Sequence, residues 1–157
     1  MSKYTVNEEI SLEAADGFKV MTDEEISAVS SGDASKRWGL WDKERHVMIL
    51  ADWKKYNGLL LGLTNISKIA ARNEELNRKL YGNYGYKPEG TIKRAIDGQE
   101  AEGYRFSYTV EGTEQSASCL LVRYKKTVYR FIVNGRTENR ERDEEIFKHV
   151  LNTAAFL

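Results

Sequence analysis

The chain has 157 residues, 41% apolar and 31% charged, which is the composition of a globular protein and not of a disordered or membrane-spanning one. Lys and Arg together number 24, as do Asp and Glu. Proteins that bind nucleic acid usually carry net positive charge, so this balance predicts no nucleic-acid partner.

No apolar run is long enough to cross a membrane, and the opening segment lacks the apolar stretch of an export signal. We therefore predict a cytoplasmic protein with no membrane partner, although a chain trimmed of its signal would look the same. Cys119 is the single cysteine, which excludes an internal disulfide. The loosest segment, residues 30–35, is too short to separate domains, so we expect residues 1–157 to form a single domain.

Charge is unevenly distributed along the chain. Residues 1–33 carry eight acidic side chains and two lysines, whereas residues 123–142 carry seven basic side chains and two acidic ones. We interpret both segments as solvated faces or as neighbours in the fold. The alternative is an anionic partner at the basic segment.

The N-terminal part predicts strands and one short helix. Residues 5–12 are extended in character, and Thr22 and Glu25 have the spacing of a capping box, which indicates a helix start. Residues 37–41 and 46–53 predict a hairpin. Both faces of its second strand are apolar, so we expect that strand in the middle of a sheet.

From Leu59 to Leu80, apolar residues recur about every 3.6 positions, which predicts the main helix. Gly62 disfavours a helix, so the regular part is expected to begin nearer Thr64, after a packed entry segment. Gly82 is expected to end the helix. The predicted apolar stripe contains Leu59, Leu63, Ile66 and Ala70, with Ile69, Leu76 and Leu80 beside it.

The last third predicts strands at residues 91–96, 104–110, 120–122 and 128–133, followed by a helix at residues 141–151. Consecutive hairpins imply antiparallel pairing, and strands with two apolar faces imply cover on both sides. The predicted fold class is α+β, with an antiparallel β-sheet covered by helices on both faces, which makes an α/β/α sandwich.

The segment from Ile96 to Phe106, two further strands and the closing run from Phe147 to Phe156 resemble the PsbP-like superfamily. That group includes the photosystem II PsbP subunit, Ran-release-factor proteins, bacterial DcrB-like domains and Eag-type secretion chaperones. The resemblance covers nearly the whole chain and rests on structural motifs. It implies an α/β/α sandwich that binds proteins, and it carries over no catalytic residue.

No set of residues specifies a reaction. Cys119 lies among apolar residues of a strand, and we interpret it as a small buried hydrophobe. His46 and His149 belong to no cluster with metal-ligand spacing, so we predict no metal and no cofactor. The acidic groups at 23–25 and 143–145 are interpreted as charge at helix starts, not as an acid–base pair.

Five aromatic residues are the candidate partner-binding positions. Tyr81, Tyr84 and Tyr86 crowd a glycine-interrupted loop, where tyrosine offers rigid contact area with a polar tip. Trp38 and Trp41 have opposite parity on one strand, so one of them is expected to face outward. The alternative is that the tyrosines cap the main helix and pack onto the core.

We predict a non-enzymatic protein-interaction domain that uses these aromatics and the sheet edge to bind a protein partner; whether it forms a homodimer stays open. A second hypothesis is a chaperone or adaptor that shelters hydrophobic helices of a secreted effector. A third is an enzyme or small-ligand binder, which requires a deep polar pocket that holds a carboxylate or histidine of shifted pKa.

Overall fold

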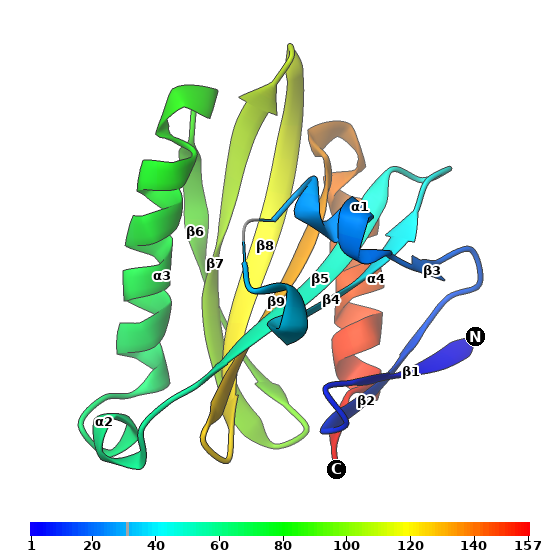
Figure 1. Cartoon of the computed structure of the whole chain (residues 1–157). Helices are drawn as coiled ribbons and strands as arrows, with labels where there is room; N and C mark the ends of the chain where they lie inside the picture. Colours follow the sequence, from blue (N-terminus) through cyan, green and yellow to red (C-terminus); the bar gives the residue numbers. More distant parts are fainter. Residues whose placement is uncertain (31) are drawn as a thin grey trace.

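The computed structural model describes residues 1–30 and 32–157. Within these residues, one antiparallel sheet has seven strands (Figure 1). In order across the sheet they are β3 (Lys19–Val20), β4 (Arg37–Asp42), β5 (Val47–Lys55), β9 (Thr127–Arg136), β8 (Thr113–Tyr124), β7 (Gln99–Val110) and β6 (Lys87–Ile96). Ser31, which belongs to the loose segment of residues 30–35, lies outside the described residues.

A smaller antiparallel sheet joins the two ends of the chain, because the last strand pairs with an N-terminal one. Its strands are β1 (Ser2–Val6), β2 (Ile10–Ala14) and β10 (Ala155–Phe156). The helices are α1 (Asp23–Ser27), α2 (Gly58–Gly62), α3 (Ile66–Leu80) and α4 (Arg140–Thr153). The α+β class with antiparallel sheets, predicted from the sequence, is confirmed.

The long hairpins turn in the gaps between the strands predicted from the sequence. Asp97 and Gly98 both have positive φ (45° and 79°), and so do Glu111 and Gly112 (49° and 80°). Two successive residues of positive φ match the right-handed twist of paired strands, which is why such tight turns close hairpins. As predicted, β5 lies inside the sheet, between β4 and β9.

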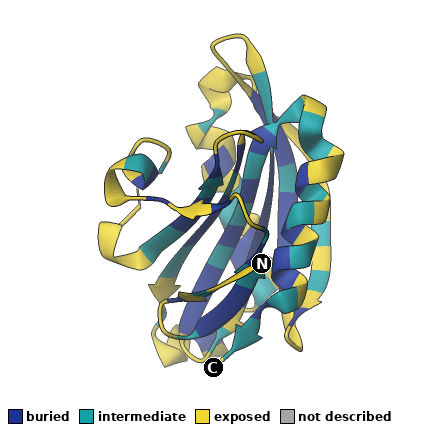
Figure 2. Ribbon diagram, turned by 90° about the vertical axis from the view of Figure 1, so that its right-hand side faces the viewer, coloured by how far each residue is buried: buried dark blue, intermediate teal, exposed yellow. Residues whose placement is uncertain are grey.

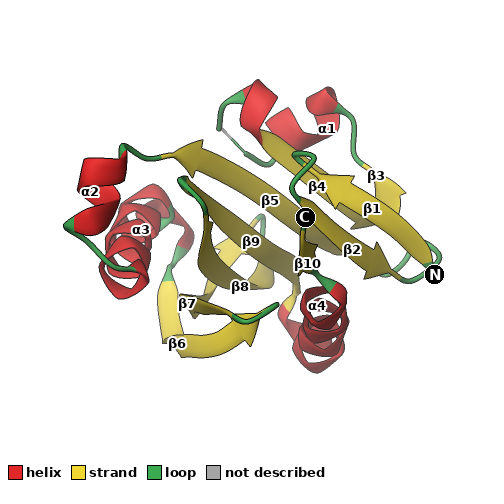
Figure 3. Cartoon of the chain, turned by 90° about the horizontal axis from the view of Figure 1, so that it is seen from below, coloured by secondary structure: helices red, strands yellow, loops and turns green. Residues whose placement is uncertain are grey.

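Alternate residues of the central strands point to opposite sides of the sheet, and each side packs against a different helix (Figure 3). On one side the buried cluster consists of Tyr104, Phe106, Tyr108, Ala117, Cys119, Leu121 and Val128 with Leu61, Ile69 and Ala70 from α2 and α3. On the other side it includes Leu120, Val122, Tyr129, Phe131 and Val133 with Phe147, Val150 and Leu151 of α4. Figure 2 shows these strands as the most deeply buried part of the molecule.

The N-terminal hairpin of β1 and β2 shares the α4 side of the large sheet, and Val6, Ile10 and Leu12 belong to the core there. The sequence analysis predicted a single extended run over residues 5–12, which is wrong. The run is interrupted at Asn7 and Glu8, whose φ values of 52° and 55° reverse the chain between the two strands. Asn is one of the residues that tolerate this conformation.

The predicted main helix is two helices, α2 and α3. The Asn65 side chain accepts a hydrogen bond from the Lys68 N–H (2.9 Å) and begins α3, close to the predicted start of the regular part. The predicted packing of the entry segment holds for Leu61, which is buried, whereas Leu59 is 72% exposed. Leu63, predicted in the apolar stripe, is 72% exposed, and Leu76 and Leu80, predicted beside it, are 60% and 61% exposed, so the predicted apolar face is wrong at these positions.

Candidate functional site: a partly covered strip of the sheet

Paired residues form continuous rows across the α3 side of the sheet. One row runs through Trp41, Met48, Asn134, Ala117 and Phe106. The next runs through Gly39, Leu50, Ile132, Cys119 and Tyr104, and a third through Arg37, Asp52, Arg130, Leu121 and Glu102. Because directly paired residues share a face, one row carries side chains from five strands to one surface.

The β7 and β8 members of these rows are mostly buried beneath α3, whereas most members from β4, β5 and β9 are only half-buried. We call the half-buried set Trp41, Met48, Asp52, Arg130, Ile132 and Asn134 the open strip. Ile132 packs against the α3 cluster and also against a small cluster of Met21, Ile26 and Leu50 beside α1. The open strip therefore lies between α3 and α1.

One flank of α3 borders the open strip. Asn73, Leu76 and Leu80 are spaced i, i+3 and i+7, so they share a flank, and Asn73 reaches Arg130 of β9 (Nη1 to Oδ1, 3.5 Å). On the opposite flank, Arg78 lies 5.8 Å from the ring of Tyr86, beside β6. The two exposed leucines of α3 thus lie on the side of the open strip.

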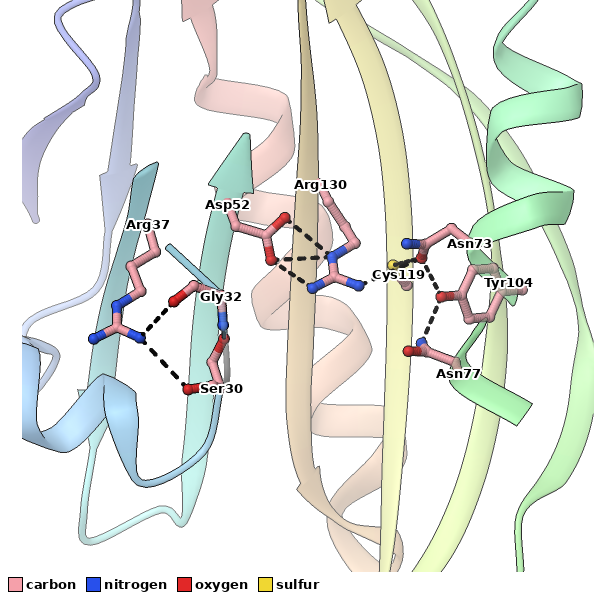
Figure 4. A network of polar contacts seen from close by, with 9 residues as sticks. All are labelled: Ser30, Gly32, Arg37, Asp52, Asn73, Asn77, Tyr104, Cys119 and Arg130. Carbon is pink, nitrogen blue, oxygen red and sulfur yellow. Dashed lines mark hydrogen bonds and ion pairs between the residues drawn. The ribbon is translucent and has the colours of Figure 1, made fainter. Parts of the chain in front are cut away.

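A polar network crosses from the open strip to the underside of α3 (Figure 4). Arg130 holds Asp52 through Nε (3.1 and 3.2 Å) and Nη2 (2.5 Å). Asn73 accepts a hydrogen bond from the Tyr104 hydroxyl, which in turn accepts one from Asn77 Nδ2 (2.5 Å). These polar side chains have partners, so the network stabilises the position of α3 on the sheet.

Cys119 lies in the same region but is not suited to nucleophilic chemistry. Its side chain is fully buried, and burial raises the pKa of the thiol to about 12. Its thiol donates a weak hydrogen bond to Asn73 Oδ1, 3.9 Å from Sγ. The thiol is therefore protonated at neutral pH, which agrees with its interpretation as a small buried hydrophobe.

The three loop tyrosines divide between the core and the surface. Tyr81 packs on Tyr108 and Phe106, with ring centroids 4.6 and 5.5 Å apart, and Tyr86 stacks on Phe106 at 5.1 Å. Burial raises the pKa of Tyr81, and that of Tyr86 to about 12. Tyr84, in the turn after α3, is 49% exposed and meets Tyr81 edge-on at 6.4 Å.

The two candidate tryptophans lie on opposite faces of β4. Trp38 is half-buried on the α4 side, where its ring centroid lies 6.0 Å from that of Tyr4. Trp41 is half-buried in the open strip, and Lys43 Nζ lies 5.2 Å from its ring centroid. Of the five candidate residues, Trp41, Tyr81 and Tyr84 are thus on the α3 side, with Tyr86 beyond them next to β6.

A small polar pocket lies on the other side, next to the start of α4. Its volume is about 70 Å³, enough for a few water molecules and far below the 300–1,000 Å³ or so typical of small-molecule sites. Its charges are largely paired, Arg105 with Glu144 (3.2 Å) and Arg140 with Glu89 (3.4 Å). Burial raises the pKa of Asp143, which also lines it. The pocket holds a shifted carboxylate but lacks the depth that the enzyme hypothesis requires.

The basic segment does not form one positive surface. Arg130 pairs with Asp52, Arg140 with Glu89 and Arg142 with Asp143 (3.0 Å). Among the described residues, no three His, Cys, Asp or Glu side chains are placed to hold a metal ion. No helix in the described part of the chain is both long and apolar enough to cross a membrane.

No protein-family model matches the sequence, and no curated protein matches it. Solved structures do match. PsbP (CyanoP) of Synechocystis sp. PCC 6803 aligns over 99% of this chain and 92% of its own, with a TM-score of 0.71 and 12% identity. LpqN of Mycobacterium tuberculosis, a protein involved in cell envelope biogenesis, aligns over 94% and 82%, with a TM-score of 0.65 and 14% identity.

The Ran-binding protein Mog1p of Saccharomyces cerevisiae aligns over 98% of this chain and 94% of its own, with a TM-score of 0.64 and 7% identity. The chain therefore has the PsbP-like fold, and the resemblance predicted from its motifs is confirmed at the level of the fold. At these identities the likeness extends to the fold and not to a particular activity.

Sequence reasoning missed most of the open strip. Met48 and Ile132 lie on strands whose two apolar faces predicted cover on both sides, and Leu76 and Leu80 were predicted beside the apolar stripe of the main helix. The helical angle of the two leucines gave no signal, because at about 100° per residue both lie within about 20° of buried Ile69.

Proposed function

We propose that the protein is a non-enzymatic interaction domain that binds a protein partner through the open strip and the adjoining flank of α3. The observation that carries this proposal is the exposure of Leu76 and Leu80, 60% and 61%, on the flank of α3 that faces the half-buried strip of Trp41, Met48 and Ile132. Apolar side chains gathered at the surface mark interaction sites. The fold neighbour Mog1p is a Ran-binding protein, which supports a protein as the class of partner.

The chemistry of the open strip favours an apolar segment with a polar edge. Leucine, isoleucine and the tryptophan ring offer apolar contact area, and Met48 adapts to irregular partners. At one end, Arg130 and Asp52 are 23% and 28% exposed, so they remain available to polar groups of a partner. In this proposal Trp41 and Tyr84 contact the partner, and Trp38, Tyr81 and Tyr86 act as structural support.

The free edge of β6 is a weaker candidate than the sequence analysis proposed. The strand carries Lys87, Glu89, Lys93 and Arg94, and its register shifts between Pro88 and Thr91. Charges, proline and bulges are features by which proteins protect sheet edges from pairing with other chains. We therefore place the contact surface on the face of the sheet.

A chaperone or adaptor for hydrophobic helices is the second candidate. Leu76 and Leu80 beside a strip that contains Met48 and Ile132 favour it, because an amphipathic helix lays its apolar face along such a surface. A partner that is captured only with its hydrophobic helix present would distinguish this role from binding to a folded surface.

We infer one domain over residues 1–157, an α/β/α arrangement of the layers, a cytoplasmic location, and no nucleic-acid partner. Packing of α3 and α4 against alternate residues of the same strands supports the layering. Whether two copies associate through the open strip is left to measurement of the mass in solution.

The test is an affinity capture from the source cells with the wild-type chain and the variant L76S/L80S, compared by quantitative mass spectrometry. We expect a reproducible partner whose recovery falls at least about tenfold in the variant. The control is V20S, since Val20 is 54% exposed but pairs with Leu40 and so points to the other face. Equal recovery with both variants would remove the open strip from the proposal.

A further inference from the structure

The turn that contains α2 exposes leucines that belong neither to the open strip nor to the adjoining flank of α3. Leu59, Leu60 and Leu63 are 72%, 56% and 72% exposed, while Leu61 between them is 3% exposed and packs into the core beneath α3. The Asn57 side chain accepts a hydrogen bond from the Leu59 N–H (2.8 Å) and caps the turn. The chain therefore anchors this turn through one leucine and presents three to the outside.

Basic side chains surround these leucines. Lys54 and Lys55 end β5 just before the turn, and Lys68 follows it on the first turn of α3. The Tyr56 N–H donates to the Lys126 carbonyl (2.7 Å), and the Lys126 side chain passes within 3.6 Å of the place a Cβ on Gly58 would occupy. The β8–β9 turn, which also carries Lys125, thus lies against α2.

This part of the surface carries little negative charge. Residues 53–73 and 121–135 contain no Asp or Glu. Lys54, Lys55, Lys68, Lys125 and Lys126 form no ion pair within 4.0 Å in the described part of the chain. At the same end of the molecule, Asp97 accepts a hydrogen bond from the Phe156 N–H, and Glu102 accepts one from Ser67 of α3 and pairs with Lys93. The five lysines are exposed, and Lys54 and Lys125 lie over the rings of Tyr56 and Tyr124 and not against a carboxylate.

We propose that this leucine and lysine turn docks on an anionic lipid surface. Exposed leucines enter the boundary between head groups and acyl chains, and lysines around them bind the negative head groups, which is the combination that holds peripheral proteins on membranes. We predicted no membrane partner because the sequence has no segment long and apolar enough to span a bilayer. That criterion does not address binding to the surface of a membrane. Charge favours lipid over a second copy of this chain, because two such turns would bring lysines against lysines.

The test is co-sedimentation with vesicles of phosphatidylcholine alone and of phosphatidylcholine mixed with phosphatidylglycerol, at low and high salt. We expect binding to the mixed vesicles only. This binding should be weaker at high salt, because salt screens the attraction between the lysines and the anionic head groups. The variant L59S/L63S should bind at least about tenfold less, and K125E/K126E should lose the salt-dependent part.

Both variants change exposed side chains, and circular dichroism with urea unfolding checks that they remain folded. The matched control is L76S/L80S, which alters the flank of α3 beside the open strip and should keep vesicle binding, so this inference and the proposed function can fail separately. Failure of the wild type to sediment with the mixed vesicles at low salt overturns the inference. So does equal binding by L59S/L63S, or a dimer that L59S/L63S dissociates without any vesicle binding.

Discussion

At the scale of single residues, burial determines the chemistry of Cys119. The side chain is fully buried, and its thiol has a pKa of about 12. Because only the thiolate reacts, native protein at pH 8 should be modified by iodoacetamide far more slowly than protein unfolded in guanidinium. Mass spectrometry over time measures both rates. Similar rates in the two states would mean that the sheet opens readily at this position.

Asp143 predicts a pH dependence of stability. Burial, which its hydrogen bonds with Arg142 only partly offset, raises its pKa in the folded state, so the folded protein holds this proton more tightly than the unfolded chain does. This contribution is therefore present below the ordinary Asp pKa of about 3.9 and is lost as the pH rises through the folded-state value.

The measurement is urea unfolding of the wild type and of D143N at several pH values from 4 to 7. Asn cannot lose a proton, so the wild type should lose stability relative to D143N as the pH rises across this range. A difference that is constant with pH, or that changes in the opposite direction, would show that the Asp143 carboxylate is better stabilised than its burial indicates.

At the scale of elements, α2 is held by one leucine among four. Leu61 is buried in the cluster beneath α3, so L61A should lower the free energy of unfolding by about 2–5 kcal/mol. Leu59 is 72% exposed, so L59A should change it by no more than about 0.5 kcal/mol. Urea unfolding of both variants tests the assignment, and equal losses would mean that α2 packs differently.

Elements whose local signals agree with their packing could be predicted from the sequence. The capping box at Thr22 and Glu25 has both of its hydrogen bonds (3.2 and 3.0 Å), and β5 lies where its two apolar faces indicated. The N-terminal hairpin could not be separated into two strands, since Asn7 and Glu8 give only a weak turn signal. Leu76 and Leu80 were misplaced because apolar spacing alone does not locate the edge of a buried face.

The candidate site was harder to predict than the fold for a physical reason. Its surface consists of side chains from β4, β5 and β9 that come together only through strand register, as in the row from Trp41 through Met48 to Asn134. Aromatic composition identified Trp41, Tyr81 and Tyr84, which lie on the relevant side. It could not separate Tyr84, which is exposed, from Tyr86, which stacks on Phe106.

At the scale of the whole molecule, the residues that stabilise the fold and the residues proposed to contact partners lie in different places. Two helices pack on alternate residues of the same strands, and this leaves the open strip on one side and the α2 turn at one end. The PsbP-like fold is shared with structures from a cyanobacterium, a mycobacterium and yeast, and a shared fold does not imply a shared function. We therefore argue the proposed binding from these surfaces and not from the fold.

The most direct test of a partner at the open strip is photo-crosslinking in the source cells, with benzoylphenylalanine in place of Leu80 or, as a control, of Val20. Both positions are exposed, at 61% and 54%, but they face different sides of the molecule. The account predicts a discrete crosslinked protein from position 80 that is absent from position 20. The same crosslinks from both positions, or none from position 80, would contradict it.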